Sequence, residues 1–79
     1  MNADQDWQRV LANQIHHQLL AEELRRLETR TTLREGERYL PNWVSREAAQ
    51  TGDVEAARRH YDRLVLRRDA IVAELGWLA

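Results

Sequence analysis

The sequence of 79 residues contains no cysteine, no lysine and no phenylalanine. Without cysteine, neither a disulfide nor a thiolate metal site can reinforce the thin core that a chain of this length buries. Without lysine, Schiff-base chemistry and catalysis by a lysine base are excluded, and all twelve basic residues are arginines. Small domains that lack such reinforcement commonly share apolar surface with another chain, and we expect the same here.

Net charge and long apolar runs are also lacking. The twelve arginines and thirteen acidic residues give a net charge of −1, which provides no overall argument for binding nucleic acid or an acidic substrate. No segment approaches the roughly 20 apolar residues that a membrane span requires, and the first residues do not follow the pattern of a signal peptide. We therefore expect a cytoplasmic protein with one domain over residues 1–79 and no membrane attachment.

Helix-breaking residues are few, and their positions divide the chain. Residues 3–35 contain no glycine or proline and are rich in helix-forming residues, which predicts a first long helix. Gly36 is expected to end this helix, because Pro41 prevents it from continuing. Residues 32–35 also match a capping box, so a new helix starting at residue 32 is the alternative to a continuous one.

The second half of the chain predicts two more helices. A short helix is expected over 45–50 within the connection, and Asp53 is expected to cap a second long helix over 53–75. Gly76 is expected to end that helix, and the apolar tail at 77–79 is expected to pack against the rest of the protein. The predicted fold is all-α, an antiparallel helical hairpin of two long helices with a short connecting helix.

The second long helix has the clearest apolar pattern. Its apolar residues alternate at spacings of three and four and form a heptad seam, with one polar exception. The seam comprises Val54, Ala57, Tyr61, Leu64, Arg68, Ile71, Leu75 and Leu78. Arg68 either lays its stem along the seam with its charged head in water, or forms an ion pair with the first helix. The candidate partners for such a pair are Glu22, Glu23 and Glu28.

The first helix carries two apolar stripes instead of one. One stripe advances in steps of four through Trp7, Leu11, Ile15 and Leu19, and the other follows heptad spacing through Leu20, Leu24, Leu27 and Thr31. A helix that is apolar on more than one side is expected to have two neighbours, and a homodimer that completes a four-helix bundle would supply the second. The residues predicted for the core or dimer seam are Trp7, Leu11, Leu20, Leu24, Leu27, Val54, Tyr61, Leu64, Arg68, Ile71 and Leu75.

Few residues suit catalysis or metal binding. The chain has one serine, Ser45, and three histidines. His16 and His17 are adjacent and would point roughly 100° apart on a helix, so they cannot bind one ion together. His60 has no second histidine near it in the sequence. We therefore expect no enzymatic activity, no metal site and no cofactor.

The spacing of the arginines is the most distinctive feature of the sequence. Arginines recur at every fourth position in two rows, one at residues 26, 30, 34 and 38 and the other at residues 59, 63 and 67. This spacing would place the like charges of each row on one helix face, where they repel by a few tenths of a kcal/mol per pair. Such rows therefore favour either binding to an anionic partner or pairing between subunits. Tryptophan and arginine are frequent at protein-binding hot spots, although tryptophans are equally expected to fill so small a core. The predicted partner-binding residues are Arg26, Arg30, Arg34, Arg38, Trp43, Arg59, Arg63 and Arg67.

Two functions are consistent with these features. The first is a small protein-interaction module, a regulator, adaptor or inhibitor that binds a larger protein. The alternative is a regulator that binds nucleic acid through arginines on the phosphate backbone. The net charge of −1 and the lack of a helix-turn-helix pattern weigh against this alternative, and a steep dependence of binding on salt would distinguish it.

Overall fold

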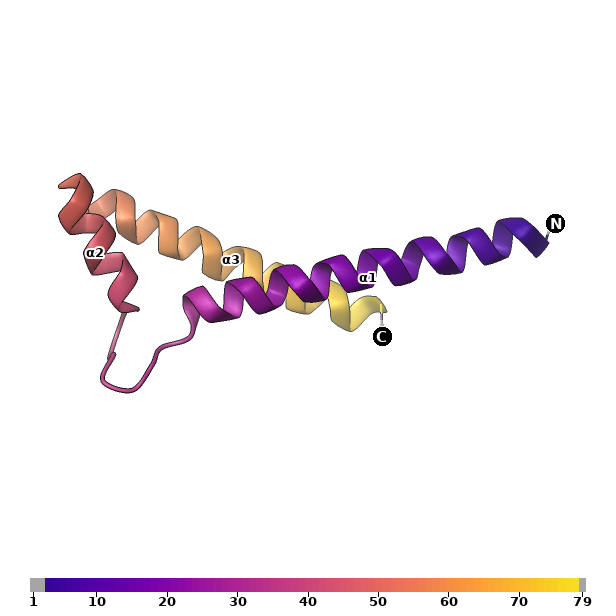
Figure 1. The fold of residues 1–79 in the computed structure, drawn as a ribbon, viewed down its shortest axis with the longest axis horizontal. Helices are drawn as coiled ribbons and strands as arrows, with labels where there is room; N and C mark the ends of the chain where they lie inside the picture. The colour runs from indigo at the N-terminus through magenta and orange to yellow at the C-terminus, as the bar shows by residue number, and fades with distance from the viewer. Residues whose placement is uncertain (1–2, 79) are drawn as a thin grey trace.

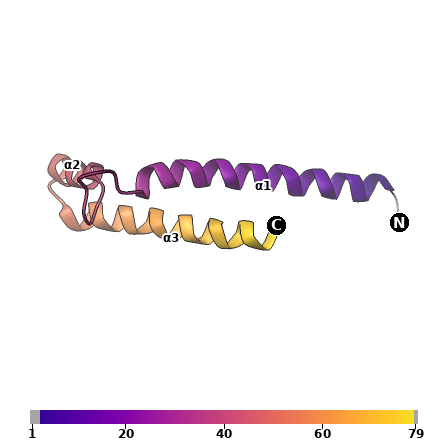
Figure 2. The same cartoon turned by 90° about the horizontal axis from the view of Figure 1, so that it is seen from below.

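The computed structural model describes residues 3–78, which form three helices: α1 (Ala3–Thr31), α2 (Asn42–Thr51) and α3 (Val54–Leu78). Helices α1 and α3 lie side by side and run antiparallel, and α2 packs across the end of α3 where the chain turns (Figures 1 and 2). The molecule is elongated, with extents of 58 × 25 × 15 Å. The predicted all-helical hairpin is therefore confirmed.

The core lies between α1 and α3 and is small. Leu20 and Leu27 of α1 and Ile71 of α3 are buried, and three further leucines of the predicted seam are half-buried against them: Leu24, Leu64 and Leu75. Helix α2 also packs against α3, and Val44 of α2 and Ala57 of α3 are both buried. The heptad spacing thus identified the side chains that hold the two long helices together.

Helix α1 ends at Thr31, four residues before the predicted end, and no helix begins at residue 32. The last carbonyl groups of α1 accept hydrogen bonds from distant side chains: Trp43 Nε1 donates to Arg30 O over 2.6 Å, and Tyr61 Oη donates to Thr31 O over 3.5 Å. These partners satisfy carbonyls that would otherwise need another helical turn. Residues 32–41 consequently form a loop, and Arg34 and Arg38 lie in this loop, outside any helix.

Helix α2 is longer than predicted because it begins directly after Pro41. The fixed φ of −60° suits proline to the residue before the first turn, and Val44 N donates to Pro41 O over 3.1 Å. The helix ends at Gly52, whose φ of 74° lies in the left-handed region that favours glycine, and Gly52 N donates to Ala48 O over 2.8 Å. Asp53 then caps α3 as predicted, with Oδ1 accepting from Ala56 N over 2.9 Å.

Helix α3 continues through Gly76, so the predicted end at that glycine is wrong. An isolated glycine costs a helix about 1 kcal/mol relative to alanine, which does not suffice to end it here. Trp77 is 89% exposed, so the predicted packing of the C-terminal tail is also wrong for this residue. Ala79, the last residue of that tail, lies outside the described residues.

Arg68 contacts the end of α1 through a hydrogen bond, and the predicted ion pair between Arg68 and the first helix is not formed. Its side chain is 30% exposed, and one guanidinium nitrogen donates to Thr31 Oγ1 over 3.1 Å. Its carboxylate partner is Asp69 of the same helix, with an N–O distance of 3.1 Å, and none of the predicted glutamates. One of those candidates, Glu23, pairs with the neighbouring Arg67 over 2.6 Å.

Candidate interaction surfaces

The N-terminal half of α1 extends past the end of α3 and carries an exposed apolar surface (Figures 1 and 2). The large apolar side chains in this half are 39–63% exposed, and we call them together the α1 ridge: Trp7, Val10, Leu11, Ile15 and Leu19. Trp7 and Leu11 were predicted for the core or dimer seam, and they contribute nothing to the core of the single chain. Val54, from the same predicted set, is 59% exposed on α3.

Three side chains of the α1 ridge, Trp7, Leu11 and Ile15, face away from α3. A helix turns by about 100° per residue, so Trp7, Leu11 and Ile15 project roughly half a turn away from Leu20 and Leu27, which face the core. The side of α1 that continues the core face toward the N-terminus carries polar residues, and the first of them, His16, still bonds to Glu74 of α3, with a distance of 3.0 Å from Nε2 to Oε1. A longer α3 would therefore still leave the ridge uncovered.

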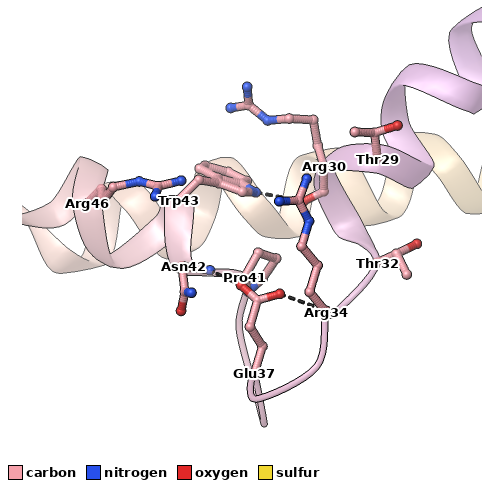
Figure 3. A pocket seen from close by; sticks show the side chains of 9 residues that line it. All are labelled: Thr29, Arg30, Thr32, Arg34, Glu37, Pro41, Asn42, Trp43 and Arg46. Carbon is pink, nitrogen blue, oxygen red and sulfur yellow. Dashed lines mark hydrogen bonds between the residues drawn. The ribbon is translucent and has the colours of Figure 1, made fainter.

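A pocket of about 220 Å³ lies at the opposite end of α1, in the corner between α1, the loop and α2 (Figure 3). We call it the corner pocket. It is lined by Thr29, Arg30, Thr32, Arg34, Glu37, Pro41, Asn42, Trp43 and Arg46. Three arginines from three successive segments of the chain surround the indole of Trp43 in this pocket. Arg30 belongs to the last turn of α1, Arg34 to the loop and Arg46 to α2.

Glu37 fixes the loop that forms one wall of the corner pocket. Its carboxylate accepts hydrogen bonds from the backbone N–H groups of Arg34 and Asn42, and its own N–H donates to Arg34 O over 3.0 Å. The two bonds from backbone N–H groups lower the pKa of Glu37 below its ordinary value, and the charges of Arg34 and Arg46 lower it further. Glu37 is therefore a negatively charged clasp that joins the start of the loop to the start of α2.

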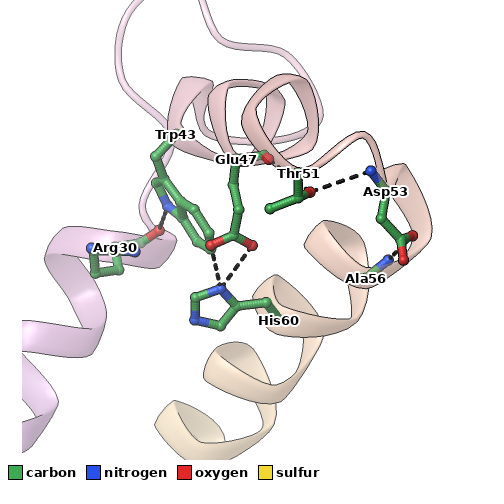
Figure 4. A network of polar contacts seen from close by, with 7 residues as sticks. All are labelled: Arg30, Trp43, Glu47, Thr51, Asp53, Ala56 and His60. Atoms are coloured by element: carbon green, nitrogen blue, oxygen red, sulfur yellow. Dashed lines mark hydrogen bonds and ion pairs between the residues drawn. The ribbon is translucent and has the colours of Figure 1, made fainter.

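Trp43 contacts side chains from the other two helices at this corner (Figure 4). Arg30 lies over its ring with the guanidinium carbon 4.4 Å from the ring centroid, and the ring of His60 packs edge-on with centroids 5.0 Å apart. His60 Nδ1 is 3.0 Å from both carboxylate oxygens of Glu47, which anchors α2 on α3. Trp43 is half-buried between α1, α2 and α3 and also lines the corner pocket, and its part in binding a partner stays a prediction.

The structure brings together three of the eight predicted partner-binding residues, namely Arg30, Arg34 and Trp43. Arg38 is exposed in the loop, and Arg26, Arg59 and Arg63 are exposed on helix surfaces away from the pocket. The row of four arginines from Arg26 to Arg38 is therefore not continuous, because its second half lies outside α1.

Arg67, the last of the predicted partner-binding residues, is occupied by a partner within the chain. It hydrogen-bonds to Glu23 through two nitrogen atoms, with distances of 2.6 and 3.2 Å. The hydrogen bond lowers the pKa of Glu23 and raises that of Arg67. Arg67 therefore joins α3 to α1.

Arg46 is the one arginine of the pocket that the sequence pattern did not predict. It stands alone in the sequence, whereas the other arginines were selected because they recur at every fourth position. A signal was nonetheless present: Pro41 is a suitable residue to precede a helix, and a helix starting at residue 42 places Trp43 and Arg46 three residues apart on one face.

Among the side chains that the structure describes, those of residues 6–77, no three histidines or carboxylates gather closely enough to hold a metal ion. None of the described helices combines the length and apolar character needed to cross a bilayer. Comparisons of the chain with protein-family models, with curated protein sequences and with solved structures found no match.

Proposed function

We propose that the protein is a non-catalytic helical interaction module, a small regulator, adaptor or inhibitor that works as a homodimer and binds a larger protein. The observation that carries the homodimer is the α1 ridge, most of which lies on the side of α1 that faces away from α3. A fully exposed large side chain presents roughly 200 Å², so the exposed fractions of the ridge correspond to about 500 Å² of apolar surface. A patch of this size is at the upper end for a monomeric protein and is typical of an interaction site.

The occupant that we propose for the ridge is the ridge of a second copy. About 500 Å² of apolar surface, extended by the polar residues beside it, approaches the roughly 800 Å² per partner of a standard interface. Side chains at every fourth position form a row inclined to the helix axis, and two such rows interdigitate when the helices cross at about −50°. A contact between identical patches closes on itself as a two-fold dimer.

The shape of the single chain supports the same assignment. Its radius of gyration is 17.7 Å, whereas a compact domain of this length would have a value of about 12 Å. Dimerisation through the ridge would place the two α1 helices at the centre and the α3 helices outside. Each α1 would then have the two neighbours that its two apolar stripes require.

The proposed dimer is tested with a charge placed on the ridge. Ile15→Glu would bury an unpaired carboxylate at the centre of the interface, and we expect it to reduce the solution mass from twice 9.3 kDa to 9.3 kDa. Asn13→Glu is the matched control, because it introduces the same residue two positions away on the polar side of α1. Equal masses for both variants, whether dimeric or monomeric, would contradict the assignment of the ridge as the interface.

Binding to nucleic acid is the alternative function, and the arrangement of the arginines gives it less support. A continuous row of four arginines on one helix could contact successive phosphates of a nucleic-acid backbone, but Arg34 and Arg38 lie in the loop outside α1. Arg67 is also paired with Glu23. The cytoplasmic location stays a prediction, with no structural feature that tests it.

A further inference from the structure

We propose that the corner pocket binds a phosphate dianion, either as free phosphate or as a phosphate monoester on a partner molecule. The pocket is formed by residues of α1, the loop and α2, at the opposite end of α1 from the ridge. Phosphate binding here does not depend on dimerisation, since the two surfaces share no residue.

The charges that line the pocket match a dianion. Arg30, Arg34 and Arg46 contribute three positive charges, and Glu37 contributes one negative charge, which leaves a net charge of +2. None of the ion pairs formed among the side chains of residues 6–77 involves any of these three arginines. Like charges that share a pocket repel one another, and a ligand with two negative charges would reduce the repulsion among the three arginines.

The chemistry of the lining also suits a phosphate group. Each guanidinium is a planar fork of N–H donors that matches the oxygens of a phosphate, and it stays charged at every accessible pH. Thr32 and Asn42 add neutral hydrogen-bonding side chains to the wall. A volume of about 220 Å³ is ample for one tetrahedral anion.

The pocket is held in shape before any ligand binds. Glu37 clasps the loop that carries Arg34, and the guanidinium of Arg30 rests on the indole of Trp43. The same indole is tied to α1 by its bond to Arg30 O. Binding therefore requires ordering of few side chains, which reduces the entropic cost of association.

The surroundings of Trp43 favour a phosphate group over a nucleotide base. Proteins that bind single strands commonly stack bases on exposed aromatic rings. Here Arg30 covers a face of the indole and His60 packs against it at close range. The pocket accordingly offers charge and hydrogen-bond donors without a free aromatic platform.

The test is isothermal titration calorimetry on the full chain with three ligands. These are inorganic phosphate, a pair of peptides that differ only by a phosphoserine, and a single-stranded oligonucleotide. We expect binding of phosphate, of the phosphopeptide or of both, and no binding of the unmodified peptide. Saturable binding of inorganic phosphate alone would identify free phosphate as the ligand, whereas tighter binding of the phosphopeptide would identify a phosphorylated partner.

Three variants distinguish specific binding in the corner pocket from nonspecific attraction to the positive charges of the surface. Arg34→Gln and Arg46→Gln each remove one donor fork from the pocket and should weaken binding at least about tenfold. Arg63→Gln removes the same charge from the exposed surface of α3 and should change affinity less than about twofold. Three equal losses, no binding of either form of phosphate, or an oligonucleotide that binds more tightly than both would overturn the proposal.

Discussion

Replacement of Ile71 by alanine tests whether the two long helices depend on a single small core. Ile71 is 0% exposed and packs against Leu20 and Leu27, whereas the half-buried leucines around them leave the cluster partly open to water. Truncation of a buried isoleucine to alanine costs about 2–5 kcal/mol, depending on how far the surroundings collapse. Because an open cluster can relax around the missing atoms, we expect a loss of about 3 kcal/mol.

A loss of this size is large for so small a protein. A chain of 79 residues is expected to have a free energy of unfolding of about 4–12 kcal/mol, so the variant would lose a quarter or more of it. The expected decrease in Tm is about 12–24 °C. The assay is urea and thermal unfolding followed by far-ultraviolet circular dichroism, with wild type and variants at one protein concentration because association would add to stability.

The control for this prediction is the neighbouring residue Val72, which is 52% exposed. Val72→Ala should change the free energy of unfolding by no more than about 0.5 kcal/mol. A loss below about 1 kcal/mol for Ile71→Ala, or equal losses for the two variants, would refute the assignment of the core.

Two further predictions concern pH and glycine. Because the pKa values of Glu23 and Glu37 are lowered in the folded protein, their stabilisation is complete above the unfolded value of 4.5 and is lost as the pH falls through their folded values. Thermal unfolding measured from about pH 6 down to about pH 3 should show Tm falling below about pH 4.5, where such carboxylates begin to take up protons. An undiminished fall in the double variant Glu23→Gln, Glu37→Gln would contradict this assignment. Gly76→Ala should stabilise the protein by up to about 1 kcal/mol, because Gly76 is helical and an added Cβ meets nothing within 4 Å. Gly52→Ala should destabilise it, because the φ of Gly52 is +74°, and chemical denaturation showing the same sign for both glycine variants would disprove the contrast between them.

The sequence predicted the parts of the fold that depend on local repetition. Leu27 and Ile71 were assigned to the core because heptad spacing repeats one face along each helix. The cap at Asp53 could be predicted because a capping side chain bonds to a backbone N–H only a few residues further on. The end of α1 depends instead on distant groups. Trp43 and Tyr61 satisfy its last carbonyls, and no pattern within residues 3–35 indicates these partners.

The corner pocket likewise depends on contacts between residues that are distant in the sequence, so only part of it could be predicted. Residue type and spacing singled out Arg30 and Arg34, but the row to which they were assigned does not exist as a helix face. Arg34 reaches the corner pocket because Glu37 folds the loop back toward α2, and Arg46 lies beside the indole of Trp43 because both residues belong to α2. Convergence of three segments is a tertiary property, and periodicity along one segment cannot predict it.

The measurement that tests the proposed dimer most directly is the solution mass of the wild-type chain by light scattering, over a range of protein and salt concentrations. We predict a mass of twice 9.3 kDa that salt does not reduce, because the α1 ridge is apolar and its burial does not depend on ion pairs. A mass that grows only with added nucleic acid at low salt, and falls back at high salt, would support the alternative function instead. A mass of 9.3 kDa at every concentration would contradict the dimer.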